Sequence, residues 1–246
     1  MRALAGSVIL VTLIVRPTAA SEWPEAHPDR PSLATGAWTT VRGALELETG
    51  VAFDTDNTRV NATLKLGVLD RLDLRLHFAE DLSPEVGVGR LGFQSKAAIV
   101  PLGDDQLGLA VSALYDLPLA DADPHRFGAL LILSYPFGDF QIDADPNVDV
   151  SLARAAGEAD VLTPQAVACL GFPIVAALGG FVETYLLLPC TEGESCRVGR
   201  VGAGVGLSYT VAGNLILDTS LDLGLDGSDP EWTVQIGLTA AVPLWR

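Results

Sequence analysis

The sequence predicts an all-β protein, a closed antiparallel transmembrane β-barrel of about twelve strands. Two observations carry this prediction. Segments of roughly ten residues alternate apolar and polar side chains along most of the chain, and the connections between them are alternately short and long. A strand with this two-residue period has one apolar and one polar face. Outer-membrane barrels combine such strands with short periplasmic turns and longer external loops.

The alternation is clearest at the end of the chain, and it recurs in 58–69 and 71–80. Soluble β-sandwiches alternate as well, so the period alone does not decide. A closed barrel is preferred because an open sheet edge in hydrocarbon leaves unpaired backbone groups, each costing several kcal/mol. In the last segment, Trp232, Val234, Ile236, Leu238, Ala240, Val242 and Leu244 alternate with Thr233, Gln235, Gly237, Thr239 and Ala241.

Twelve segments fit the strand pattern. With an even number of strands, both chain ends lie beside the short turns, in the periplasm, and the longer loops face outward. The longer loops are acidic, which predicts a negative external rim. The expected strands are 42–53, 58–69, 71–80, 86–99, 105–117, 127–137, 139–150, 164–175, 180–189, 199–211, 213–225 and 231–245.

The chain divides into three parts. Residues 1–20 combine Arg2, an apolar stretch and the small residues at 18–20, which is typical of a secretory signal peptide. The apolar stretch is shorter than the ~20 residues of a membrane anchor. Residues 21–40 hold three prolines and no alternation, and we expect a Pro-rich lead-in in the periplasm. Residues 41–246 form the barrel, so the chain is expected in the outer membrane.

Charge and cysteine content narrow the functions. A formal net charge of −16 argues against nucleic acid as a partner. Cys190 and Cys196 bracket a short loop, which favours a disulfide in an oxidising compartment. A thiolate metal site needs three or four ligands, so we expect no metal there and no cofactor. Cys169 is expected to pack as a small apolar residue.

Charged side chains also occupy the inward-facing positions of the strands. They permit two interpretations, an ionic plug that stabilises a narrow barrel, or a lining that selects and conducts a solute. Strand number does not decide between them, because ~8 strands are filled by side chains whereas 16 to 18 leave a channel. The candidate lumen-lining residues are Glu46, Glu48, Lys65, Asp73, Arg75, Lys96, Glu183, Asp218 and Asp222.

Other patterns carry weaker hypotheses. Asp73, Arg75 and His77 share a face, as in a hydrolase, but that chemistry needs a positioned nucleophile and Ser83 is not fixed nearby. No catalytic residue is therefore assigned, and we expect no enzyme. The acidic loops could hold Ca²⁺ or Mg²⁺, although a solvated rim that concentrates cations is preferred. The glycines of 199–206 precede no helix, which excludes a nucleotide loop and favours relief of crowding inside a barrel.

Three stretches resemble a bacterial outer-membrane β-barrel "transporter" family, named for the MetA pathway of phenol degradation. They are Asp29-Arg30-Pro31, Leu45 to Gly50, and Gly67 to Arg75. The chain departs from that family at Asp73, where Glu is expected, and in ending on Trp245-Arg246. The resemblance implies a secreted outer-membrane barrel of a kind often labelled a transporter without an established substrate. The family name suggests a small hydrophobic or aromatic solute.

The leading hypothesis is thus a passive outer-membrane channel or transporter for a small solute. Its expected partners are outer-membrane lipid and that solute. The alternative is a closed-lumen structural or surface-binding barrel without transport. A membrane-embedded hydrolase comes third.

Overall fold

The computed structural model describes residues 23–29, 32–81, 89–119, 125–151, 160–191, 196–227 and 230–245. The predicted signal peptide and several acidic loop residues, such as Glu85, Asp121 and Glu192, lie outside these ranges. Within them, no helix is long and apolar enough to cross a membrane.

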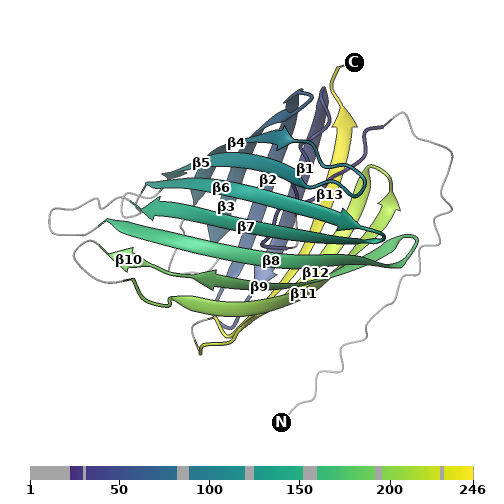
Figure 1. Ribbon diagram of the computed structural model, residues 1–246. Coiled ribbons are helices and arrows are strands. Elements are labelled where there is room, and N and C mark those ends of the chain that lie inside the picture. Colours follow the sequence, from purple (N-terminus) through teal and green to yellow (C-terminus); the bar gives the residue numbers. More distant parts are fainter. Residues whose placement is uncertain are drawn as a thin grey trace, which may run out of the picture.

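The described residues form one antiparallel sheet that closes on itself, which confirms the predicted fold class (Figure 1). Neighbouring strands pair in chain order, β9 joins β11, and β13 pairs with β1 to complete the ring. The short β10 (Cys190–Thr191) pairs only with β8, so the barrel itself has twelve strands. These are β1 (Ala44–Phe53), β2 (Thr58–Leu69), β3 (Leu72–Asp81), β4 (Arg90–Val100), β5 (Gly108–Pro118), β6 (Arg126–Phe137), β7 (Phe140–Ser151), β8 (Val161–Val175), β9 (Leu178–Leu187), β11 (Arg200–Ala212), β12 (Leu215–Gly224) and β13 (Trp232–Pro243).

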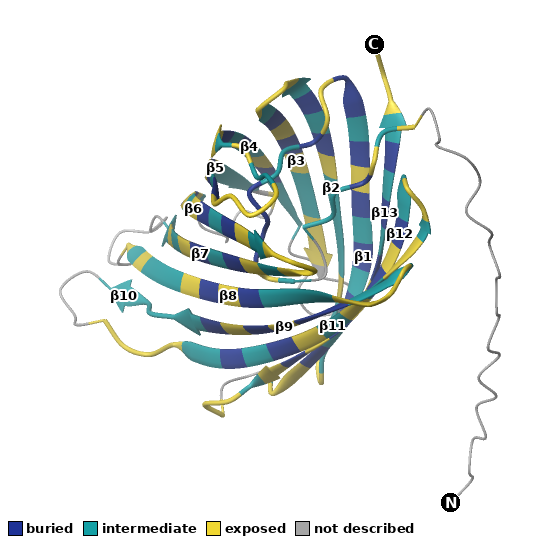
Figure 2. Ribbon diagram, turned by 45° about the vertical axis from the view of Figure 1, so that its right-hand side comes forward, coloured by how far each residue is buried: buried dark blue, intermediate teal, exposed yellow. Residues whose placement is uncertain are grey.

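The two-residue period determines which side chains face inward. In β1, Glu46 and Glu48 are buried, whereas Leu47 and Phe53 on the opposite face are exposed. Figure 2 shows the same alternation of buried and exposed positions around the barrel. Large apolar side chains exposed on the outer face include Leu64, Leu74, Phe93, Val111, Leu131, Ile142, Val182, Val205, Leu217, Leu221 and Ile236. Such an apolar outer surface suits a bilayer.

Tight turns close one end of the barrel. Gly138, with a φ of 59°, lies in the β6–β7 turn, and Asp105, with a φ of 52°, lies in the β4–β5 connection. Glycine accepts this left-handed conformation freely, and aspartate tolerates it better than most residues. The sequence predicted short turns at both places.

The glycine-rich strand β11 leaves room for its neighbours inside the barrel. A Cβ at Gly204 would lie 2.5 Å from Asp222 Oδ1 and 2.8 Å from Glu183 Oε1. At Gly202 and Gly206 the Tyr185 and Phe181 rings would meet an added Cβ. These glycines therefore relieve crowding, as the sequence analysis expected.

The chain before β1 does not lie where the sequence predicted. Residues 21–40 were expected to form a Pro-rich lead-in in the periplasm, but residues 26–29 and 32–40 lie inside the barrel. Ala26, Ala34 and Ala37 are buried among barrel side chains, and the backbone from His27 to Thr40 donates hydrogen bonds to inward-facing groups of the strands. We call residues 26–40 the luminal segment, of which 30 and 31 lie outside the described residues. Inward-facing carboxylates need donors, and this segment offers its backbone N–H groups.

Trp38 belongs to the luminal segment, where its indole N–H donates to the carbonyl of His27 at 3.3 Å. Lys96 lies 6.0 Å from its ring centroid. By contrast, the aromatic side chains of Phe53, Tyr135 and Trp232 are exposed on the outer face.

A charge on the outer face tests whether that face meets lipid. Leu64 lies midway along β2 and is exposed outward. We expect Leu64→Arg to lower the free energy of unfolding in phospholipid vesicles by about 2–4 kcal/mol. Urea unfolding followed by tryptophan fluorescence measures the change, with Leu64→Met as control. Equal stability of both variants would contradict a lipid-facing surface.

Candidate functional site

The luminal segment enters and leaves the barrel through the end with the tight turns. Its first hydrogen bond runs from the backbone N–H of Ala26 to the carbonyl of Gly213, in the β11–β12 turn. Its far end returns to the same side of the barrel. There the backbone of Arg42 forms an isolated β-bridge with Gly67, and the carbonyl of Gly43 accepts a hydrogen bond from the backbone N–H of Leu244. The segment therefore forms a loop within the lumen.

Backbone N–H groups of this loop donate to side chains of several strands. His27 donates to Glu46 and Asp29 donates to Glu48, each at 2.7 Å. The donations of the whole segment reach β1, β3, β6, β7 and β9, and so hold it on several sides. Its other partners are Glu183 for Leu33 at 2.9 Å, Asp145 for Thr35 at 2.5 Å, Ser134 for Ala37 at 2.7 Å and Asp73 for Thr40 at 3.0 Å.

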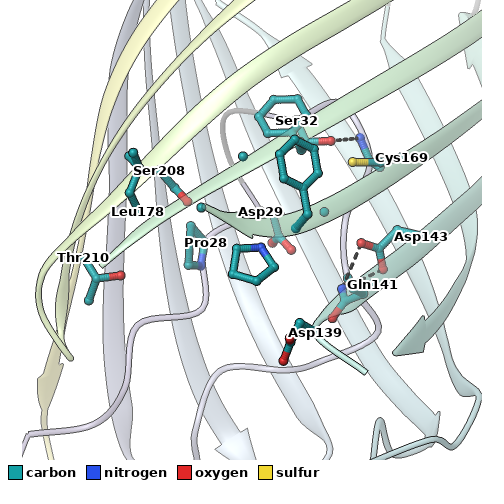
Figure 3. Close-up of a pocket in the computed structure, with 18 of the residues that line it drawn as sticks. Pro28, Asp29, Ser32, Asp139, Gln141, Asp143, Cys169, Leu178, Ser208 and Thr210 are labelled. Carbon is teal, nitrogen blue, oxygen red and sulfur yellow. Dashed lines mark hydrogen bonds between the residues drawn. The ribbon is translucent and has the colours of Figure 1, made fainter. Parts of the chain in front are cut away.

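The Asp29 carboxylate is the centre of the charge network in the lumen. It lies 2.9 Å from Lys65 Nζ, 2.5 Å from Arg75 Nη1 and 3.3 Å from Lys96 Nζ. Figure 3 shows Asp29 within the barrel, between strands on opposite sides. The Thr35 hydroxyl donates to the same carboxylate. One acidic side chain of the luminal segment thus joins three cations from β2, β3 and β4.

The cations also bind carboxylates of the barrel wall. Lys65 lies 2.9 Å from Glu46 and 2.5 Å from Glu48, and Arg75 lies 2.7 Å from Asp73. Buried charges are tolerated only when they are paired and hydrogen-bonded. Here each charged side chain lies beside at least one side chain of opposite charge. We call Asp29, Glu46, Glu48, Asp73, Lys65, Arg75 and Lys96 the luminal ion network.

Burial alone would raise the pKa of the Asp29 carboxyl. The positive charges of Arg75, Lys65 and Lys96, together with the Thr35 hydroxyl, outweigh that effect and hold its pKa well below the usual range. Asp29 is consequently a carboxylate at neutral pH, which is the form that binds the cations.

All nine candidate lumen-lining residues are buried on the inner face of the barrel. Six of them, Glu46, Glu48, Lys65, Asp73, Arg75 and Lys96, belong to the luminal ion network. The other three, Glu183, Asp218 and Asp222, come from β9 and β12 on another part of the wall.

The acidic side chains of β9 and β12 have a different set of partners. Glu183 Oε2 accepts from the Ser32 hydroxyl at 2.6 Å, and Asp222 Oδ2 accepts from Gln235 at 3.0 Å. The remaining oxygens, Glu183 Oε1 and Asp222 Oδ1, both approach Gly204. Glu183 thus joins this part of the wall to the luminal segment through hydrogen bonds alone, whereas β1 to β4 are joined to the segment through both hydrogen bonds and ion pairs.

The luminal segment separates two cavities. The inner cavity, of about 420 Å³, lies toward the tight turns between Pro28, Asp29 and Trp38 of the segment and Gln141, Asp143 and Ser208 of the wall (Figure 3). The outer cavity, of about 660 Å³, lies toward the longer loops, and Leu33 is the residue of the segment that lines it. Both volumes fall in the range of small-molecule sites.

The outer cavity contains four arginines that were not among the predicted lumen-lining residues. Arg59, Arg90, Arg126 and Arg200 line it from β2, β4, β6 and β11. Each shares the inward parity of its strand, as Arg59 does with Lys65 and Arg90 does with Lys96, so parity could have identified them. Asp29 also escaped prediction, because it precedes every strand and no period gives its direction.

The described residues contain no assembled catalytic triad of the kind that the hydrolase hypothesis requires. The ring nitrogens of His77 contact Thr63 Oγ1 at 2.9 Å and Gln94 Oε1 at 2.5 Å, and Asp73 binds Arg75 and Thr40. Ser83 lies outside the described ranges. Nor do three or more His, Cys, Asp or Glu side chains gather as metal ligands in the part of the chain that the structure covers. Cys190 and Cys196 form a disulfide, and Cys169 is buried with a free thiol.

No family model and no curated protein matches the chain. Several solved structures do. The crystal structure of an outer membrane channel from Pseudomonas putida F1 matches with a TM-score of 0.62 and 10% sequence identity, over 91% of this chain and 100% of that one. The NanC porin matches with a TM-score of 0.60 and 10% identity, over 80% and 98%. The KdgM porin matches with a TM-score of 0.57 and 8% identity, over 79% and 98%.

The chain has the fold of an outer-membrane porin. Identities this low concern the fold alone. The resemblance to the phenol-degradation family, which rests on short stretches of sequence, is not confirmed and stays a prediction.

Removing the charge of Asp29 should weaken the barrel. We expect Asp29→Asn to lower the free energy of unfolding by about 3 kcal/mol, because it leaves buried cations with fewer counter-charges. Urea unfolding in detergent micelles measures this loss. The matched control is Glu25→Gln, an exposed carboxylate just before the luminal segment, which should change stability little. An equal effect of the two substitutions would disprove the central role of Asp29.

The same contribution should depend on pH. A carboxyl whose pKa is lowered by folding adds stability that is fully present above its unfolded pKa of about 3.9. That stability is lost as the pH falls from there through the lowered pKa of the folded state. The difference in unfolding free energy between the wild type and Asp29→Asn should therefore be constant from pH 7 to 5 and shrink below pH 4. A difference that is independent of pH down to 2 would contradict the ion pairing.

Proposed function

We propose that the protein is an outer-membrane barrel that passively conducts a small solute. The observation that carries the proposal is the pair of cavities, each lined by both polar and apolar side chains, placed end to end in the lumen of a closed barrel with an apolar outer wall. In this proposal the outer face meets outer-membrane lipid, the tight turns face the periplasm and the outer cavity faces the cell exterior.

The lining of the path supports a hydrated solute. The luminal ion network lies midway along the path, between the luminal segment and β1 to β4. The outer cavity adds further charged side chains and the amides of Asn61, Asn147 and Gln165. Charges in a lumen replace part of the hydration shell of a polar solute. No cofactor is needed for such passage, since diffusion supplies the motion.

A closed-lumen barrel is the second candidate, and the luminal ion network is the observation that favours it. The segment is held by backbone hydrogen bonds and by three cations. If these contacts persist at all times, the two cavities remain separate and the protein serves as a structural or surface-binding barrel.

Conductance separates the two candidates. We expect the refolded protein to produce discrete conductance steps in planar lipid bilayers, and Asp29→Asn to raise their size or open time severalfold because the luminal segment is then held less firmly. Boiled, unfolded protein is the control for detergent artefacts. Absence of steps in both proteins, together with absence of solute flux into liposomes, would reject conduction and favour the closed barrel.

A further inference from the structure

The outer cavity combines two kinds of wall. Four guanidinium groups reach it from β2, β4, β6 and β11, so positive charge is distributed around its circumference. The carboxylates among its lining residues are Glu80 and Asp222. Guanidinium groups therefore outnumber carboxylates in this cavity, although the chain as a whole has a net charge of −16.

One of these arginines is held in a fixed position with donor capacity to spare. Arg200 lies over the ring of Tyr185, 5.6 Å from the ring centroid, and one of its terminal nitrogens donates to the carbonyl of Pro230 at 3.1 Å. Its buried Nε has no hydrogen-bond partner among the described residues. A buried donor without an acceptor destabilises the protein, and an anionic ligand would supply the missing acceptor.

The other arginines differ in how far they are already paired. Arg59 lies 3.0 Å from Asp54 on the rim, and Arg126 interacts electrostatically with Asp149 of β7. Arg90 forms no ion pair with any residue that the structure describes. Arg90 and Arg200 are thus the two guanidinium groups of the cavity with the least neutralised charge.

The remaining wall is apolar. Val167, Tyr185 and Leu187 belong to one hydrophobic cluster on β8 and β9, and all three line the outer cavity beside Arg200. Leu33, at the tip of the luminal segment, also lines it and is 50% exposed although it lies inside the barrel. An apolar side chain presented to a cavity favours a ligand with an apolar part.

We propose that the outer cavity binds a small aromatic carboxylate, with its carboxylate on Arg200, in the positive field of Arg90 on the facing wall, and its ring against Leu33, Val167, Tyr185 and Leu187. Guanidinium groups bind carboxylates through paired, charge-assisted hydrogen bonds. An aromatic ring placed against the apolar wall removes the exposed Leu33 side chain from water. The site deepens the proposed function by naming the solute class, and its role as an entry site rests on that function.

Calorimetric titration of the refolded protein in detergent tests the site without requiring conduction. The probes are benzoate, acetate, which lacks the ring, and benzyl alcohol, which lacks the charge. We expect benzoate to bind at least tenfold more tightly than either. Equal affinity for benzoate and benzyl alcohol would overturn the role of the arginines, and equal affinity for benzoate and acetate would overturn the role of the apolar wall.

Variants assign the two halves of the ligand. Arg90→Gln and Arg200→Gln should each weaken benzoate binding about tenfold or more, while Arg71→Gln, an exposed arginine in the β2–β3 turn at the opposite end, should leave it unchanged. Leu33→Ser should reduce the preference for benzoate over acetate severalfold and leave acetate unaffected. Equal loss in all four variants would overturn the assignment to the outer cavity.

Bilayer recordings keep the two proposals distinguishable. Benzoate added on the side of the longer loops should shorten the open time of the wild type and have less effect on Arg90→Gln. Channels that ignore benzoate would overturn the site and leave conduction intact. Tight benzoate binding by a protein that never conducts would support the site and reject the proposed function.

Discussion

The structure depends on the neutralisation of charge inside a closed sheet. Because every second side chain of a strand points inward, the lumen of this barrel receives the acids of β1 and β3 and the cations of β2, β3 and β4. Such groups cannot be left unpaired at low cost away from water. The Asp29 carboxylate solves part of this problem by contacting Lys65, Arg75 and Lys96 at once.

That solution brings a piece of chain into the lumen. The backbone N–H groups of residues 27–40 satisfy carboxylates that the wall itself does not pair, including Asp145 and Glu183. The segment in turn divides the lumen into an inner and an outer cavity of different character. The inner cavity has Asp29, Asp139 and Asp143 on its lining, and the outer one has four arginines. The packing of the luminal segment and the shape of the lumen therefore both follow from the pairing of inward-facing charges.

Most of the barrel could be predicted from the sequence because a two-residue period is a local signal. The predicted strands at 58–69 and 127–137 agree with β2 and β6 to within one residue at each end, and the number of barrel strands was predicted as twelve. The same parity placed Glu46, Lys65 and Glu183 on the inner face, where each is buried.

The luminal segment could not be predicted in the same way. Its conformation is fixed by contacts to residues far along the chain, such as Leu33 with Glu183, and no local period records them. Prolines and the absence of alternation correctly excluded a strand, but they do not say whether an irregular segment lies outside a barrel or within it. Arg59, Arg90, Arg126 and Arg200 are a different case, since their parity was available and only their clustering in one cavity required the closed sheet.

Hydrogen exchange of the backbone amides tests the position of the luminal segment most directly. In the folded barrel in detergent at pH 7, the amides of His27, Asp29, Leu33, Thr35, Ala37 and Thr40 donate to side chains of the wall. The backbone amides of residues 26–40 should therefore exchange with solvent about a hundredfold more slowly than the same amides in the unfolded protein. Exchange at the rate of the unfolded chain, with the strands still protected, would show that the segment lies outside the barrel and would contradict the account.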